Sequence, residues 1–276
     1  LPERITRTGH VDNQWAVGPA VLWAPWFLAA HAVVRVTGAD AQDGWALIYR
    51  RACAAGSFVY GVLALWLGVL GARCFGVSAG AAWASALVVW GGSSLVVYTV
   101  LLPFSAHAAG AFTVSWWLYF AASRAYRPLR VSEWAAWGGL AGLMAMTYLV
   151  NAVFAAVAVP VWWVVLRREG AGAAVVRASV FLAAALAVAS PQLIGKAVVY
   201  GSPLVTGYEE SWHWLTPQLW NTAFSTNHGV VLWTPVVAVG LIGCAVLARR
   251  KRLMVGMLAA ALLFYVLIAS YGNWHG

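Results

Sequence analysis

Charged side chains are scarce in this chain of 276 residues, of which only 9% are Asp, Glu, Lys or Arg. Soluble domains carry about 25% charged residues, because these residues cover the surface that meets water. Hydrophobic residues make up 63% of the sequence, and the mean hydropathy is +0.78. So little charge excludes a soluble globular domain of this size and indicates a protein whose surface faces lipid.

The sequence also lacks the motifs of common soluble enzymes. It contains no GxxxxGK[ST] or HExxH motif, and no GxGxxG that follows a predicted strand. Only three cysteines are present, Cys53, Cys74 and Cys244, and they lie in or beside apolar runs without forming a CxxC pair. We interpret them as packing residues and predict neither a disulfide framework nor a metal site.

Long apolar runs dominate what is present. Each is roughly 20 residues long, the length of helix that crosses a hydrocarbon core of about 30 Å. The runs lie near residues 15–36, 53–72, 79–102, 106–123, 134–150, 151–166, 178–197, 230–248 and 253–271. They are rich in Ala, Leu and Val and lack the two-residue alternation of barrel strands. They predict an all-α fold, a polytopic transmembrane helical bundle that forms a single domain over residues 1–276.

Three basic clusters lie in connections between these runs. They are Arg124/Arg127/Arg130, Arg167/Arg168/Arg177 and Arg249/Arg250/Lys251/Arg252. Because cytoplasmic loops are enriched in Lys and Arg, the net charge of +9 indicates cytoplasmic loops rather than a nucleic-acid partner. Two runs separate each cluster from the next, as a shared side of the membrane requires. If the remaining runs cross the membrane one after another from these cytoplasmic clusters, the connections 37–52, 103–107 and 198–229 lie on the outer side.

The first run, 15–36, allows two interpretations. Its hydropathy favours an outward-running span. Its prolines and its Trp15, Trp23 and Trp26 also suit a helix that lies in, or dips into, the outer leaflet.

Ionisable groups other than arginine gather on the predicted outer side. Six of the eight acids and five of the six histidines fall there, and the spanning runs are almost free of such groups. A transporter would more often place them near mid-membrane. The distribution therefore favours chemistry at the outer surface.

The outer loop 198–229 supplies four candidate site residues. Glu209 and Glu210 are candidates for accepting a proton, binding a metal or pairing with Lys196 or Arg50, and the alternative is a solvated loop pair. His213, between Trp212 and Trp214, is a candidate for contacting a sugar or a phosphate, and the alternative is an interfacial aromatic cluster. His228 follows in the same loop.

Cationic candidates lie at helix ends on the same side. His107 stands at the outer start of a helix, where either an anion-binding helix terminus or a simple polar first turn is expected. Arg50 and Arg51 break the positive-inside pattern, which suggests a lipid phosphate as ligand or plain headgroup contact.

Several phrases resemble a known family. Trp15-Ala-Val-Gly-Pro-Ala-Val-Leu-Trp-Ala-Pro-Trp-Phe-Leu28, Tyr200-Gly-Ser-Pro-Leu-Val-Thr-Gly-Tyr208, Phe224-Ser-Thr-Asn-His-Gly-Val-Val-Leu-Trp-Thr-Pro235 and Tyr271-Gly-Asn-Trp-His-Gly276 resemble segments of bacterial membrane glycosyltransferases. These belong to the C-type (GT-C) superfamily and include the family-39-like protein O-mannosyltransferases and aminoarabinose transferases. The phrases occur in the same order as in that family, and none is a catalytic signature.

The resemblance implies a transferase in the bacterial inner membrane that uses a polyprenyl-phosphate sugar as donor at its outer face. The acceptor would be a lipid, a glycan or a protein. In that family the segment matching 15–36 is a juxtamembrane helix, so about eight spanning helices are expected here. The family's catalytic acid follows its first spanning helix, which would precede Leu1. We therefore expect a fragment that also lacks the C-terminal part, and we do not assign Asp12 as the base.

The same resemblance suggests roles for the candidates. Arg50, Arg51, Lys196 and His107 would stabilise the leaving phosphate, whereas Glu209 and Glu210 would orient the sugar or acceptor. Trp212, Trp214 and Trp220 would stack on sugar or prenyl surface. The family often carries an acid near residues 104–107, and this chain has His107 there instead, so no residue supports a divalent metal. The alternatives are a transporter and a catalytically inactive polytopic membrane protein.

Overall fold

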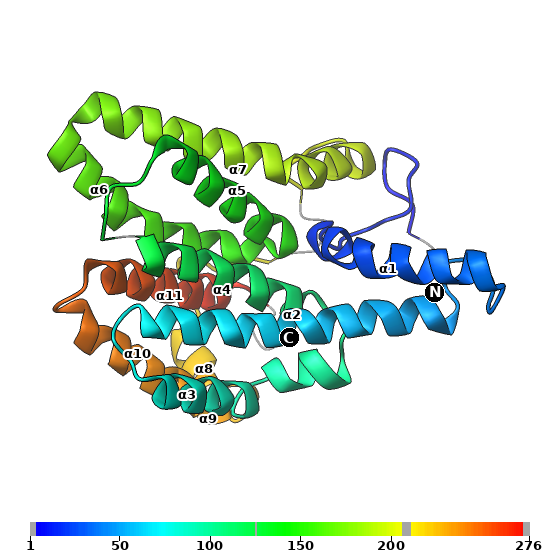
Figure 1. Ribbon diagram of the computed structural model, residues 1–276, viewed down its shortest axis with the longest axis horizontal. Coiled ribbons are helices and arrows are strands. Elements are labelled where there is room, and N and C mark those ends of the chain that lie inside the picture. The colour runs from blue at the N-terminus through cyan, green and yellow to red at the C-terminus, as the bar shows by residue number, and fades with distance from the viewer. Residues whose placement is uncertain (1–3, 125, 206–210, 273–276) are drawn as a thin grey trace.

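The computed structural model describes residues 4–124, 126–205 and 211–272, which form helices and no strand (Figure 1). The helices are α1 (Gly18–Thr37), α2 (Leu47–Arg73), α3 (Ala79–Gly91), the π-helix η1 (Val97–Leu101), α4 (Ala106–Arg124), α5 (Val131–Thr147), the 3₁₀ helix η2 (Leu149–Val157), α6 (Ala158–Glu169), α7 (Ala171–Tyr200), α8 (Leu219–Phe224), α9 (Val230–Trp233), α10 (Pro235–Ala248) and α11 (Arg252–Ser270). The predicted all-α fold is confirmed for these residues.

Five helical segments are long and apolar enough to cross a membrane. They are α1, α2, η2 with α6, α7, and α11. Two further apolar helices, α3 and α10, have 13 and 14 residues, fewer than the roughly 20 that a span requires. Helices of this length and composition are typical of an integral membrane protein. The expected count of about eight spans is not confirmed.

Helices α5 and α7 pack with their backbones in direct contact. A Cβ atom at Gly138 would lie 2.1 Å from the carbonyl oxygen of Phe181, and one at Gly142 would lie 2.2 Å from that of Ala185. Both glycines lie on one face of α5, four residues apart. Small residues at this spacing let membrane helices approach closely, where dispersion replaces the hydrophobic effect as the driving force. Only glycine fits at these two positions.

An aromatic core lies beside this contact. Trp117 of α4 and Trp137 of α5 stack at 4.7 Å between ring centroids, and each is at most 1% exposed. The ring of Phe181, on α7, meets Trp117 edge-on at 5.8 Å. The indole of Trp117 donates a hydrogen bond of 3.1 Å to the carbonyl of Phe154, in η2. The core therefore joins four elements of the bundle.

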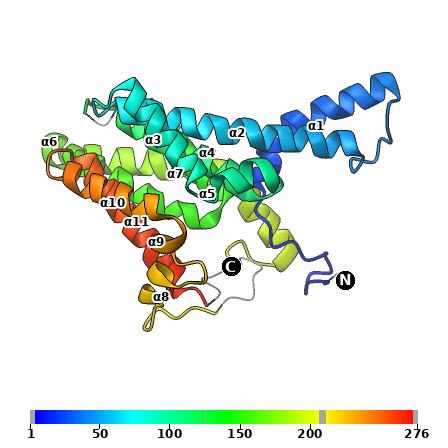
Figure 2. The ribbon, with the colours of Figure 1, turned by 90° about the horizontal axis from the view of Figure 1, so that it is seen from below.

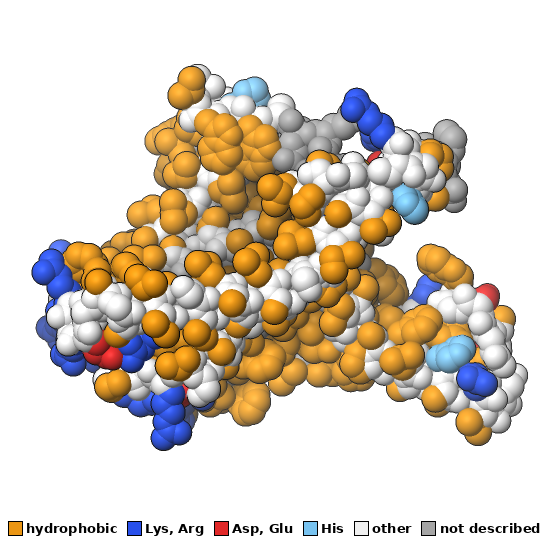
Figure 3. Space-filling view, turned by 90° about the horizontal axis from the view of Figure 1, so that it is seen from above, with side chains coloured by type: hydrophobic (Ala, Val, Ile, Leu, Met, Phe, Trp, Pro, Cys, Tyr) orange, Lys and Arg blue, Asp and Glu red, His pale blue; other side chains and the backbone are white. Residues whose placement is uncertain are grey.

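One end of the bundle carries most of the positive charge, and we call it the basic end. The ring of Tyr126, after α4, contacts Phe75 after α2 at 6.4 Å, and Nζ of Lys251 lies 5.3 Å over it. These contacts bring three connections together, and Figure 3 shows Lys and Arg side chains gathered at this end. The turn between α6 and α7 lies at the same end (Figure 1). Eleven of the 17 cations lie in or beside these four connections: Arg73, Arg124, Arg127, Arg130, Arg167, Arg168, Arg177, Arg249, Arg250, Lys251 and Arg252.

Both acids at the basic end are paired with arginine. Arg127 donates two hydrogen bonds to the carboxylate of Glu133, which also accepts the Arg130 amide at 3.0 Å. The Arg127 side chain and this amide lower the pKa of Glu133 to about 2. Glu169 accepts a hydrogen bond of 2.5 Å from Arg177.

The opposite end of the bundle carries a projecting helical hairpin. Gly18 lies against the backbone of Thr147, the last residue of α5, so α1 begins where α5 ends. Figure 2 shows α1 and the first half of α2 extending side by side beyond the other helices. Trp23 donates a hydrogen bond of 2.8 Å to Ser57, and Tyr60 donates one of 2.7 Å to the carbonyl of Leu22. These bonds fix α1 along α2.

Helix α2 begins earlier than the run 53–72 predicts. The carboxylate of Asp43 accepts the amides of Trp45 at 2.7 Å and Ala46 at 2.9 Å, which fixes the chain just before Leu47. These amide bonds lower the pKa of Asp43. As a consequence Arg50 and Arg51 lie in the first turns of α2, not in a connection.

The predicted run 79–102 is interrupted in the structure. Helix α3 ends at Gly91, and the chain resumes helical structure only in η1. Trp90 donates a hydrogen bond of 3.1 Å to Thr99, which bridges the break. The interruption follows from two consecutive glycines and two serines, which weaken a helix interior.

Substitution of Gly138 or Gly142 by Ala should destabilise the protein, because the added methyl group would push α5 away from α7. We expect a loss of about 1–3 kcal/mol for each, seen as a lower melting temperature in detergent. The control is Gly139→Ala, whose Cβ would make an ordinary contact of 3.6 Å with Val188. Equal melting temperatures for all three variants would contradict this packing.

Stability should also fall in acid through Glu133. Its pKa is about 2 in the folded protein and 4.5 ordinarily, so its contribution is present above pH 4.5 and is lost as the pH falls toward 2. The pair is near the surface, which limits its contribution to about 1 kcal/mol. Glu133→Gln should remove this contribution at pH 7 and flatten the pH dependence of unfolding below pH 4.5. An unchanged pH profile would contradict it.

Candidate functional site

His107 lies in a cluster of rings at the end of the bundle opposite the basic end. It stands in the first turn of α4, with its ring centroid 4.0 Å from that of Tyr98 in η1. Tyr148, between α5 and η2, meets it edge-on at 5.6 Å. All three side chains are half-buried. We call Tyr98, His107 and Tyr148 the His107 cluster.

A second ring cluster lies at the same end of the bundle and consists of Trp212, Trp214 and Tyr271. The two tryptophans stack at 5.0 Å with an interplanar angle of 5°, and Trp212 lies 5.3 Å from Tyr271. Backbone bonds hold the segment in place, since the His213 amide donates to the Ser270 carbonyl at 2.7 Å. Tyr148 precedes η2 and Tyr271 follows α11. These two helices pack on each other, with the rings of Phe154 and Phe264 5.7 Å apart, so Tyr148 and Tyr271 lie at the same end of the bundle. We call Trp212, Trp214 and Tyr271 the Trp212 cluster.

The two loop histidines, His213 and His228, make no ring contact with His107 among the described residues. The ring of His213 is exposed. His228 is exposed as well and stacks on Trp233 at 5.1 Å, in a turn where its φ is +71°. Among the ring contacts of the described residues, neither histidine touches the His107 cluster.

Arg50 and Arg51 are exposed on the projecting hairpin. Neither side chain makes a hydrogen bond or an ion pair in the part of the chain that the structure describes. The hydroxyl of Ser57, six residues and about 9 Å of helix from Arg51, donates to the carbonyl of Pro103. Pro103 precedes His107 by four residues, so the two arginines lie beyond the His107 cluster along α2.

Lys196 is held inside the protein, at 6% exposure. Its ammonium donates to the carbonyls of Asn13 and Gln14, both at 3.1 Å, and lies 4.9 Å over the ring of Tyr200. The side chain of Gln192, one turn earlier on α7, accepts the amide of Val17 at 2.7 Å. These bonds fix the segment before α1 along the end of α7.

Asp12 belongs to this fixed segment. Its carboxylate accepts a hydrogen bond from the hydroxyl of Tyr200 and forms an ion pair of 3.7 Å with Arg4. It therefore ties the segment to α7 from a second position.

Three candidates remain. Glu209 and Glu210 lie outside the described residues. Trp220 is exposed and packs on Phe224 at 4.5 Å, apart from the Trp212 cluster. No group of three or more metal-ligating residues occurs in the described ranges.

Sequence reasoning identified His107, Trp212 and Trp214 but missed Tyr98, Tyr148 and Tyr271. The three tyrosines lie at the ends of apolar runs, where tyrosine is ordinary at a membrane interface. The one signal in the sequence is position, because each tyrosine stands near the end of an apolar run that lies opposite the basic end. Together the rings offer flat apolar faces and phenolic hydroxyls, which suit a sugar or a prenyl chain.

No protein-family model matches this chain, and neither a curated protein nor a solved structure matches it.

Replacing Lys196 by Met should loosen the segment before α1, because Met keeps the apolar stem but removes the bonds to Asn13 and Gln14. Trypsin should then cleave at Arg4 and Arg7 several-fold faster, since cleavage reports local opening. The matched control is Arg51→Met, which removes an exposed cation with no such bonds. Equal cleavage rates in the two variants would contradict the role of Lys196.

Proposed function

We propose that this protein is a membrane glycosyltransferase that moves a sugar from a polyprenyl-phosphate donor to an acceptor at the end opposite the basic end. The observation that carries the proposal is that the His107 and Trp212 clusters lie at the same end of the bundle, where rings from four separate segments gather. Aromatic faces of this kind bind the apolar faces of sugars, and phenols and imidazole bond their hydroxyls. The resemblance to C-type glycosyltransferases supplies the reaction class.

The distribution of charge supports the orientation in this proposal. One end carries eleven cations and two acids, and cytoplasmic loops of membrane proteins are enriched in Lys and Arg in this way. The ring clusters would then face the outer side, where polyprenyl-linked sugars are used by the family.

The projecting hairpin supports a juxtamembrane α1. Helix α1 starts at the end of α5 and leads away from the bundle, so it would lie at the outer surface rather than cross the same bilayer. The tryptophans of α1, Trp23 and Trp26, suit that interface. On this view α2, α3 with η1, α4, α5, η2 with α6, α7, α10 and α11 are the eight spanning segments.

The proposed reaction is a displacement at the anomeric carbon. A carboxylate base, not assigned to a described residue, takes the proton of the acceptor hydroxyl as its oxygen attacks. The bond from that carbon to the phosphate oxygen breaks, and polyprenyl phosphate leaves with the electron pair. Arg50 and Arg51 stabilise the phosphate charge, and their exposed guanidinium groups are available for it. The ring clusters position the sugar.

Transfer from labelled polyprenyl-phosphate mannose or glucose to membrane acceptors tests the proposal with the full-length protein. His107→Ala and the double variant Arg50→Gln/Arg51→Gln should each reduce transfer, by roughly 100-fold where a phosphate contact is lost. Arg7→Gln, which removes an exposed cation from the same end, should retain activity.

Two outcomes would contradict the proposal. One is the absence of transfer from any polyprenyl-phosphate sugar by folded wild-type protein. The other is full activity in both site variants, which would separate the ring clusters and the arginines from the reaction.

A further inference from the structure

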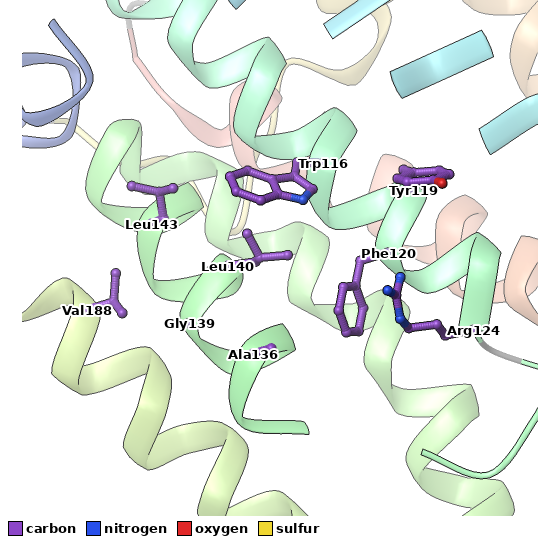
Figure 4. A pocket seen from close by; sticks show the side chains of 9 residues that line it. All are labelled: Trp116, Tyr119, Phe120, Arg124, Ala136, Gly139, Leu140, Leu143 and Val188. Carbon is purple, nitrogen blue, oxygen red and sulfur yellow. The ribbon is translucent and has the colours of Figure 1, made fainter. Parts of the chain in front are cut away.

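A lateral groove of about 530 Å³ runs along the bundle between α4 and α5, with α7 at its edge. Figure 4 shows the side chains that line it. They are Trp116, Tyr119, Phe120 and Arg124 of α4, Ala136, Gly139, Leu140 and Leu143 of α5, and Val188 of α7. The residues of α4 and of α5 recur at three- and four-residue steps, so each helix contributes one stripe.

The groove is apolar along its length and positive at one end. Arg124, its only charged lining residue, lies at the basic end, and its guanidinium sits 4.2 Å over the ring of Phe120. Figure 4 shows this guanidinium beside Phe120, at the far end from Trp116 and Leu143. A long apolar slot with a cation at one mouth matches an acyl chain that carries an anionic headgroup.

The length of the groove matches one leaflet. Trp116 and Arg124 are eight residues apart, which is about 12 Å of helix. One leaflet contributes about 15 Å of hydrocarbon, half of a core of about 30 Å. A chain anchored at Arg124 would therefore end near the middle of the membrane, as a lipid of that leaflet does.

The charges around Arg124 favour an anion. Nε of Arg124 lies 3.4 Å from Glu133, but that carboxylate is already bound by Arg127 through two hydrogen bonds. The connection after Arg124 keeps an excess of positive charge. Arg130 lies in it, directly before α5, and Lys251 lies over the ring of Tyr126, two residues after Arg124.

We infer that this groove binds one anionic phospholipid of the leaflet at the basic end, with an acyl chain along α4 and α5 and its phosphate on Arg124. This site is independent of the glycosyl transfer proposed above, because it lies at the other end of the bundle. It is distinct from general surface attraction, which needs no groove and falls away with salt.

Native mass spectrometry of the full-length protein, purified with equal amounts of phosphatidylglycerol and phosphatidylcholine, tests the site. Wild-type protein should retain phosphatidylglycerol preferentially. Arg124→Gln should reduce that preference roughly ten-fold, the loss of one charge-assisted bond. Ala136→Phe, which fills the groove from an exposed position, should reduce retention of both lipids.

Two control variants separate the groove from plain charge and plain bulk. Arg167→Gln removes another basic-end arginine that lies over an aromatic ring, Trp163, at 4.7 Å but outside the groove. Ala183→Phe adds a ring at an exposed alanine of α7 that does not line it. Both should retain phosphatidylglycerol as the wild type does, and melting temperatures show that each variant is folded.

Several results would overturn the inference. One is equal retention of phosphatidylglycerol in the wild type, Arg124→Gln and Ala136→Phe. Another is loss of retention in Arg167→Gln to the same degree as in Arg124→Gln, which indicates surface charge alone. Displacement of phosphatidylglycerol by an equimolar amount of polyprenyl phosphate would assign the groove to a prenyl carrier, and a dimer without bound lipid would assign it to a second copy.

Discussion

The separation of charge along the bundle is the constraint on which the rest of the structure depends. A chain with 17 cations and 8 acids and so many apolar helices has to collect its charge where helices begin and end, because a charged side chain inside a membrane is costly. Here the helix ends near Tyr126 take eleven of those cations and only two acids. The other described acids, Asp12, Asp40 and Asp43, lie away from these helix ends, and the ring clusters lie at the opposite end.

Apolar packing then fixes the helices between these two ends. Lipid is as apolar as the helix surfaces, so burial of leucine and valine cannot hold such a bundle together. Close backbone contact at Gly138 and Gly142, with the tryptophan core beside it, supplies attraction that lipid cannot match. The lateral groove shows the opposite case, an open space between neighbouring helices instead of close backbone packing. Along the groove α4 presents the rings of Trp116, Tyr119 and Phe120, and a slot remains between α4 and α5.

The sequence predicted the features that local composition determines. These are the helical fold and the positions of most helices, because length and hydropathy of a run need no knowledge of its neighbours. The start of α2 was missed because it depends on the carboxylate of Asp43, a single side chain. The count of spans was not confirmed because the run 79–102 is interrupted between α3 and η1, and because α10 has only 14 residues.

The ring clusters and the burial of Lys196 could not be predicted in full, since each depends on contacts between segments far apart in the chain. His107 and Tyr148 are 41 positions apart, and the ammonium of Lys196 reaches the carbonyls of Asn13 and Gln14 about 180 residues away. A lysine on an apolar helix looks like a candidate phosphate ligand until its partners are seen. The structure shows instead a cation that holds the segment before α1, so Arg50 and Arg51 are the stronger candidates for binding phosphate.

Labelling of single cysteines in whole cells tests the orientation of the charge asymmetry most directly. In a protein whose three native cysteines are replaced by alanine, Ser132→Cys marks the basic end and Ser211→Cys marks the end with the ring clusters; both serines are exposed. A maleimide that cannot cross membranes should label Ser211→Cys in intact cells and Ser132→Cys only after permeabilisation. Labelling of Ser132→Cys from outside, with Ser211→Cys protected, would contradict the account.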